Sequence, residues 1–185
     1  YFKEEIWTEN PHPHASLDTY LQFAPAISVY DLNMAGVKGK NSLFDASMIY
    51  LFSNLIMNTI VFTVKNISHE QRPDGSDYYS FPSGHTAEAF TSAEFLYQEY
   101  RGRSPWIGIA GDGLAASVGY LRMYNNKHWL HDVVAGAGCG IASTRLAYFL
   151  YPKIKKLFAG RKALHSLMLP SYASGMWSLS LVKEF

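Results

Sequence analysis

Residues 122–132 are the stretch from which the fold and the chemistry of this chain are best worked out: Arg122-Met-Tyr-Asn-Asn-Lys-His128-Trp-Leu-His-Asp132. The two asparagines predict a turn that feeds a helix, so we expect His128 in the first turn of that helix. His128 and Asp132 would then lie four residues apart on one helix face. A carboxylate there can fix the tautomer of the imidazole and leave its other nitrogen free as a nucleophile. Arg122 adds a planar, permanently charged group that suits phosphate oxygens.

A histidine and an aspartate at this spacing are more often an ordinary surface pair, so the interpretation depends on residues further upstream. Six residues separate Lys65 from Arg72-Pro73, and then comes the run Pro82-Ser83-Gly84-His85. Ser83 is predicted to cap a helix, whose unpaired backbone amides form an anion site that Gly84 lets a ligand approach closely. Helix ends that meet at one mouth of a bundle would form a pocket for a tetrahedral dianion.

Composition limits the other possibilities. The 185 residues favour a single domain over residues 1–185, with an N-terminal arm at 1–24. The formal net charge of +1 gives no sign of a nucleic-acid partner. The single cysteine excludes an internal disulfide. Polar residues interrupt the most apolar window, residues 48–64, and the mean hydropathy is −0.07, so we expect a water-soluble helical domain, at most in peripheral contact with a membrane.

The pattern along the chain predicts an all-α bundle with a small C-terminal β-hairpin. The expected helices cover residues 25–34, 42–66, 83–102 and 105–124, with a last helix through 128 and beyond. Alternation at residues 165–169 and 177–185, with turn residues at 171–175, predicts the hairpin within residues 163–185. Glycines in the last two helices indicate helices whose backbones approach closely. His12 and His14 in the arm are a minor alternative as metal ligands.

Taken together, the three motifs resemble the signature of the type 2 phosphatidic acid phosphatase superfamily, which includes bacterial class A acid phosphatases and vanadium haloperoxidases. The resemblance covers residues 65–132, in the order and spacing of the family. It implies the helical bundle of the acid phosphatase and haloperoxidase type. One departure is Leu121, because the family usually has serine before the second arginine. This change is expected to affect affinity or substrate choice more than the type of reaction.

The resemblance implies a role for each motif residue. His128 would attack phosphorus to form a phosphohistidine, Asp132 would orient it, and His85 would protonate the leaving oxygen. The non-bridging oxygens would be held by Lys65, Arg72, Arg122, Ser83 and the amide of Gly84. Because fixed side-chain cations supply the charge, this chemistry needs neither a metal nor a cofactor.

The sequence leaves the substrate open between a lipid phosphate, an isoprenoid diphosphate and a small soluble monoester. Two alternatives of another class are a vanadium-dependent haloperoxidase and a non-catalytic phosphate-binding envelope protein. The family's common location and a first residue other than methionine lead us to expect the bacterial cell envelope, in particular the periplasm. Nothing in the sequence indicates an oligomeric state.

Overall fold

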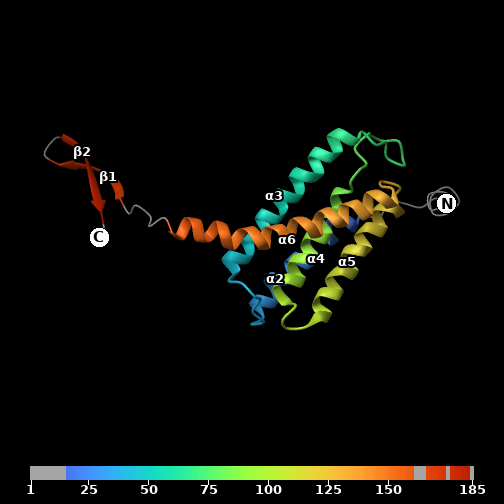
Figure 1. Ribbon diagram of the computed structural model, residues 1–185, viewed down its shortest axis with the longest axis horizontal. Coiled ribbons are helices and arrows are strands. Elements are labelled where there is room, and N and C mark those ends of the chain that lie inside the picture. Colours follow the sequence, from blue (N-terminus) through green and yellow to red (C-terminus); the bar gives the residue numbers. More distant parts are fainter. Residues whose placement is uncertain (1–15, 161–165, 174–175, 184–185) are drawn as a thin grey trace. The chain divides into compact units, whose positions relative to one another are not determined.

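The computed structural model describes residues 16–160, 166–173 and 176–183, with side chains up to residue 157. The helices of this part are α1 (Asp18–Leu21), α2 (Ala24–Met34), α3 (Leu43–Ser68), α4 (Gly84–Tyr100), α5 (Pro105–Tyr124) and α6 (Leu130–Gly160) (Figure 1). Two strands follow, β1 (Ser166–Ala173) and β2 (Met176–Lys183). The chain divides into two compact units, residues 1–148 and 149–185, and the site described below lies in the first. The prediction of one domain stays a prediction.

The predicted helices α2 to α5 are confirmed within a few residues of their expected ends. Ser42 caps α3, its hydroxyl accepting a hydrogen bond from the backbone N–H of Asp45 at 3.2 Å. α3 ends where His69 adopts a left-handed conformation with φ of 46°. Ser83 caps α4 as predicted, and Pro105 occupies the first turn of α5.

The start of α6 differs from the prediction. The helix begins at Leu130, so His128 lies in the connection before it and not in its first turn. The cause is Asp132, whose carboxylate reaches back to accept the backbone N–H of Trp129 at 2.9 Å, as the third residue of a helix does in a capping box. Asn126, with φ of 56°, turns the chain ahead of this cap.

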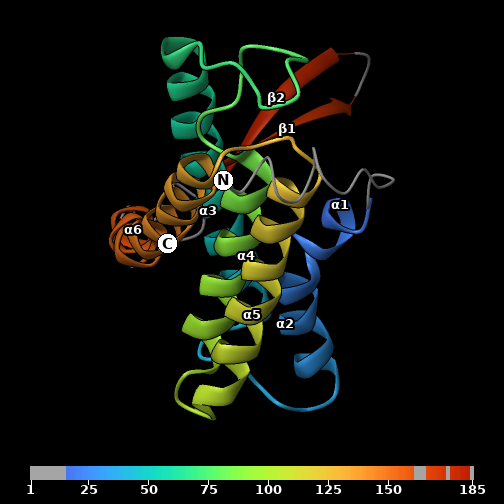
Figure 2. The same cartoon turned by 90° about the vertical axis from the view of Figure 1, so that its right-hand side faces the viewer.

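Helix α4 is the centre of the first unit and contacts α2, α3 and α5 (Figure 1). Figure 2 shows α4 and α5 side by side. α6 approaches α4 so closely that a Cβ at Gly140 would come within 2.3 Å of the Ala87 carbonyl oxygen, and one at Gly136 within 2.5 Å of the Ser83 carbonyl oxygen. These contacts confirm that the glycines of α6 serve close packing. Three hydrogen bonds bring the end of α3, the start of α4 and the α5–α6 connection together at one end of the unit. Lys65 donates to the Ser80 carbonyl oxygen, the Ser83 N–H to that of Asp132, and Arg72 to that of Lys127.

The surfaces of two helices count against the expectation of a water-soluble domain. Two helices, residues 43–68 and 130–157, are long and apolar enough to cross a membrane, and only 22% and 28% of their most apolar windows are buried. Phe62 on α3 is 71% exposed. The polar residues of α3 do not count against a span, because Asn58 and Thr59 donate to carbonyl oxygens four residues back, at 2.9 and 2.7 Å.

The remaining predicted segments are the two termini. β1 and β2 pair antiparallel, with Ser166 opposite Lys183 and Ala173 opposite Met176, so β1 extends into the predicted turn at 171–175. The all-helical class is the part of the predicted fold that is shown, and the hairpin stays a prediction. The predicted arm 1–24 includes the short helix α1, while His12 and His14 lie outside the described residues.

Candidate active site

His128 occupies the connection between α5 and α6, where it is only 4% exposed. Its Nδ1 lies 3.3 Å from Oδ2 of Asp132, and its Nε2 lies 3.3 Å from Nη1 of Arg72. Because a guanidinium can only donate, Nε2 acts as the acceptor in this contact and Nδ1 carries the proton toward Asp132. Burial lowers the pKa of His128 to about 4; the hydrogen bond with Asp132 opposes this shift, while the charges of Arg122, Arg72 and Lys65 add to it. At neutral pH the residue is therefore a neutral imidazole with a lone pair on Nε2.

Asp132 is fully buried, and three donors converge on its Oδ2. They are the Ser80 hydroxyl, in a short hydrogen bond, the backbone N–H of Trp129 at 2.9 Å, and Nδ1 of His128. The backbone carbonyl of Asp132 also accepts the N–H of Ser83 at 3.0 Å, which fixes the start of α6 against the start of α4. Sequence reasoning missed Ser80, since a serine in a loop of turn residues carries no signal of its own.

Lys65 and Arg72 hold the α3–α4 loop around this pair. Lys65 Nζ donates to the carbonyl oxygens of Tyr79 at 2.5 Å and Ser80 at 3.3 Å. Arg72 Nε donates to Oδ1 of Asp77 at 2.8 Å, and its Nη1 lies 3.3 Å from the Lys127 carbonyl oxygen. Both predicted phosphate ligands therefore lie beside His128 and also support the loop that carries Ser80.

Arg122 is paired with a residue that sequence reasoning placed in the N-terminal arm. Its Nη1 donates to Oδ2 of Asp18 on α1 at 2.6 Å, and both side chains are largely buried. Its Nε has no hydrogen-bond partner in the part of the chain that the structure describes. A buried donor of this kind fits a ligand oxygen that completes the site. Nothing in the sequence indicated that Asp18 pairs with Arg122, because no feature of a polar, proline-rich segment distinguishes this aspartate from its neighbours.

His85 and Ser83 belong to the start of α4. Burial lowers the pKa of His85, and the nearby charge of Arg122 lowers it further, with Asp18 opposing and Arg72 and Lys65 adding to the shift. The Ser83 hydroxyl accepts from the backbone N–H of Thr86 at 3.4 Å and from its hydroxyl at 2.9 Å, so it acts here as a helix cap. No Cβ contact closer than 4.0 Å would be made at Gly84, which leaves the amide end of α4 open to close approach.

A second layer of contacts fixes the α3–α4 loop to the start of α6. Lys127 Nζ pairs with Oδ2 of Asp74 at 2.5 Å, and His131 Nε2 lies 2.6 Å from Oε1 of Glu70. Glu70, His131 and Asp132 place one ligand atom each within 4.8 Å of one another, a grouping that could hold a metal ion. The two carboxylate oxygens of Asp132 face different partners, because Oδ2 accepts from His128 while Oδ1 lies 3.2 Å from His131 Nε2.

Comparisons with known proteins agree with this picture. A family model described as the PAP2 superfamily matches residues 46–156, a range that contains all three motifs and ends before β1. Lipid A 1-phosphatase of Porphyromonas gingivalis is 34% identical over 138 residues, covering 74% of this chain and 31% of that protein. The bacitracin transport permease protein BcrC of Bacillus licheniformis is 35% identical over 75 residues, covering 40% of this chain and 35% of that protein.

Among solved structures, the crystal structure of Aquifex aeolicus LpxE superposes with a TM-score of 0.55 at 23% identity, covering 78% of this chain and 93% of that chain. At this identity the likeness concerns the fold alone. The chain spans about a third of the length of the curated relatives it matches.

Proposed function

The chain belongs to the PAP2 superfamily, and on that premise we propose that it is a metal-independent phosphatase that moves the phosphoryl group of a lipid phosphate first to His128 and then to water. The single observation that carries the proposal is the state of His128. Asp132 accepts a hydrogen bond from the protonated Nδ1, while Nε2 keeps a lone pair beside the cation of Arg72. A nucleophile with this arrangement is ready without prior deprotonation.

In the first step Nε2 of His128 attacks phosphorus, the P–N bond forms, and the bond to the leaving alcohol oxygen breaks. His85 gives that oxygen its proton. As the imidazole gains positive charge, Asp132 stabilises it through Nδ1–H. Water then attacks the phosphohistidine, with His85 in its neutral form taking the proton, so the second step restores both histidines.

The cations hold the phosphoryl oxygens during both steps. In this proposal Arg122 uses its unpaired Nε, and Arg72 and Lys65 contribute charge from the loop side. A bound phosphate dianion adds negative charge next to His85, which raises the pKa of that imidazole and favours the protonated form that acid catalysis needs. Charge stabilisation of this kind supplies most of what phosphoryl transfer requires.

A lipid phosphate is the substrate class that we favour among those left open by the sequence. Two helices long and apolar enough to cross a membrane support this choice, and the relative from Porphyromonas gingivalis is named for a lipid A phosphatase activity. α3 alone, with 26 residues, is about 39 Å long, which exceeds the roughly 30 Å of a hydrocarbon core. The site at the end of α3 would then lie at headgroup depth.

We further propose that the site faces away from the cytoplasm, in a bacterial envelope membrane. The connections at the other end of the unit, residues 35–42 and 101–104, carry four cations and no carboxylate. Loops that remain in the cytoplasm carry such an excess of lysine and arginine. This orientation gives the site access to lipids of the outward leaflet.

The decisive experiment is to trap the intermediate. Purified chain is mixed with a panel of 32P-labelled lipid phosphates and stopped in base, in which a phosphohistidine survives. We expect label on the wild type and none on His128→Gln, with turnover that persists in EDTA. Vanadate-dependent bromide oxidation would favour the haloperoxidase instead. Absence of both label and turnover across the panel would favour a binding protein.

A further inference from the structure

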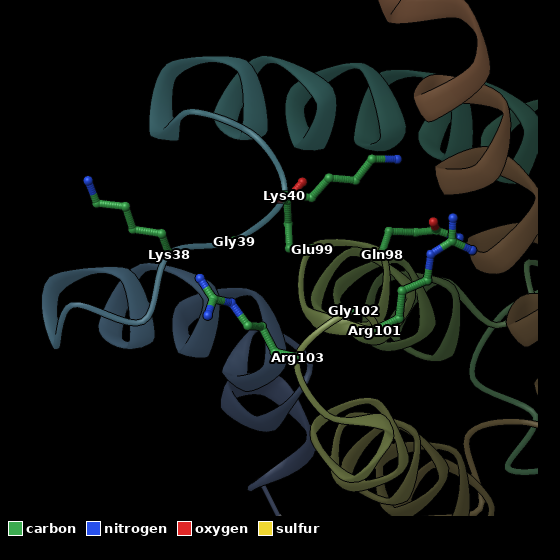
Figure 3. Close-up of a pocket in the computed structure, with 8 residues that line it drawn as sticks. All are labelled: Lys38, Gly39, Lys40, Gln98, Glu99, Arg101, Gly102 and Arg103. Atoms are coloured by element: carbon green, nitrogen blue, oxygen red, sulfur yellow. The ribbon is translucent and has the colours of Figure 1, made fainter.

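A cavity of about 320 Å³ lies at the end of the first unit opposite His128, and four of its eight lining residues are cationic. The lining residues come from the α2–α3 connection and from the end of α4 with the turn that follows (Figure 3). They are Lys38, Gly39, Lys40, Gln98, Glu99, Arg101, Gly102 and Arg103. Figure 3 shows Lys38 and Arg103 on one side of Gly39, and Lys40 and Arg101 on the other.

The positive charges around this cavity are not neutralised by carboxylates of the cavity itself. Its one carboxylate, Glu99, already accepts from the backbone N–H of Asn41 at 2.9 Å, from the Asn41 side chain at 2.6 Å and from the Tyr148 hydroxyl at 2.6 Å. None of the four cations forms a salt bridge with another residue in the described ranges. Lys40 lies over the ring of Tyr148, 5.9 Å from its centroid. Four cationic residues therefore border the cavity and its one carboxylate is already engaged, although the ammonium groups of Lys38 and Lys40 point in opposite directions (Figure 3). The net positive charge around the cavity favours an anionic ligand.

Apolar side chains flank the cavity on both chain segments. α3 begins three residues after Lys40, and its second residue, Phe44, is 74% exposed. Three residues after Arg103 comes Trp106, which is also 74% exposed. Exposed tryptophan next to arginine is typical of the membrane–water interface, where the ring lies at headgroup level. Cations at this depth, with apolar residues on the membrane side, match the two parts of a phospholipid.

We propose that this cavity binds the phosphate-bearing headgroup of an anionic phospholipid in the leaflet opposite the phosphatase site. The proposal rests on the membrane topology given under the proposed function, but not on the phosphatase chemistry. α4 separates the two sites and, with 17 residues, is about 26 Å long, so the headgroup bound here is distinct from the phosphate that reaches His128. The ligand is held in this cavity and not cleaved, because no nucleophile with an activating base lines it.

Gly102 offers a direct test. A Cβ at this position would meet no heavy atom within 4 Å, and its φ does not lie in the left-handed region, so larger residues fit without strain. Gly102→Glu adds a carboxylate to the cavity, and Gly102→Gln adds the same bulk without charge. Binding is measured with delipidated chain in detergent, by titration with phosphatidylglycerol, phosphatidylcholine and soluble glycerol phosphate. Helix content and thermal unfolding establish that each variant is folded.

We expect phosphatidylglycerol to bind the wild type and Gly102→Gln within about twofold of each other, and Gly102→Glu at least about tenfold more weakly. Phosphatidylcholine should bind weakly to the wild type and to both Gly102 variants. The double variant Lys38→Gln with Arg103→Gln should also bind phosphatidylglycerol more weakly than the wild type. The control Lys153→Gln with Lys156→Gln removes the same charge elsewhere and should keep the wild-type affinity. Equal affinity of Gly102→Glu and Gly102→Gln for phosphatidylglycerol would overturn the proposal. Tight binding of glycerol phosphate would show that a free phosphate ester, and not a lipid, is the ligand.

The test separates this proposal from the phosphatase assignment. Turnover of nitrophenyl phosphate should be unchanged in Gly102→Glu, since the substitution lies at the far end of α4. If the wild type lacked all phosphatase activity, the titration with phosphatidylglycerol would still decide the role of the cavity.

Discussion

The Ser80 hydroxyl gives the sharpest test of how the histidine is held. It donates to Oδ2 of Asp132, the same oxygen that receives Nδ1–H of His128, and Ser80 is fully buried. Ser80→Ala removes one of the three donors on this oxygen and leaves the Trp129 amide at 2.9 Å. The backbone carbonyl of Ser80, which accepts from Lys65, is untouched by the substitution. The variant therefore isolates the support of the carboxylate.

The size of the effect follows from the kind of hydrogen bond. A bond to a charged group contributes roughly 1.5–3 kcal/mol. If that support acts in full on the imidazolium-like transition state, loss of the hydroxyl slows formation of the phosphoenzyme by about tenfold to somewhat over a hundredfold. KM should change little, because Ser80 contacts none of the phosphate-holding groups through its side chain.

The assay is rapid-quench formation of the phosphoenzyme with one lipid phosphate, in detergent, at substrate concentrations around KM. Ser143→Ala is the matched control, because Ser143 is also a buried serine and its hydroxyl has no hydrogen-bond partner in the described residues. It should keep the wild-type rate within about twofold. A Ser80→Ala rate equally close to the wild type would refute the reasoning, as would an equal loss in Ser143→Ala.

The other predictions concern the histidines, metal dependence and pH. His128→Ala should form no phosphoenzyme with any substrate, whereas His85→Ala should lose far more rate on an alkyl phosphate than on nitrophenyl phosphate, by about a hundredfold; equal losses would place the acid elsewhere. Turnover should survive EDTA and be inhibited by vanadate, and loss in EDTA that a divalent metal restores would point to the metal grouping that includes Glu70 and His131. The folded-state pKa of His128 is about 4, below its ordinary 6.5, so the associated stability is complete above pH 6.5 and is lost as pH falls toward 4. Melting temperatures should show that His128→Gln escapes this loss of about 3 kcal/mol, and identical pH slopes would contradict it.

The sequence was sufficient for the helices because their signals are local. Ser83 is a polar cap before an apolar run and Pro105 opens α5, so the beginnings of α4 and α5 were predicted from single residues. The predicted start of α3 at residue 42 falls on its cap, Ser42. The start of α6 was misplaced because Asp132 belongs to the cap of that helix as well as to the histidine pair. The four-residue spacing to His128 predicts only one of these two roles of Asp132, so it could not predict where the helix begins.

Pairings between distant segments could not be predicted. Ser80 is 52 residues from Asp132, and Asp18 is 104 residues from Arg122, so no periodicity connects them. The two helices that are long and apolar enough to cross a membrane were missed for a different reason. Mean hydropathy averages the apolar faces of α3 and α6 with polar loops, and the asparagines of α3 count as polar although their donors are satisfied inside the helix.

The charges at the site explain why its cations are paired as they are. Three cations around one buried histidine repel one another, and each has a partner that limits this cost: Asp77 for Arg72, Asp18 for Arg122, and loop carbonyls for Lys65. These partners also fix the directions of the cations, so on the proposed function a phosphate dianion would meet donors already in position and little reorganisation would be needed. The depressed pKa values of His85 and His128 have the same origin in burial and positive charge. In the proposed mechanism, one arrangement thus keeps the nucleophile His128 unprotonated in the free chain and lets an arriving anion favour protonation of the acid, His85.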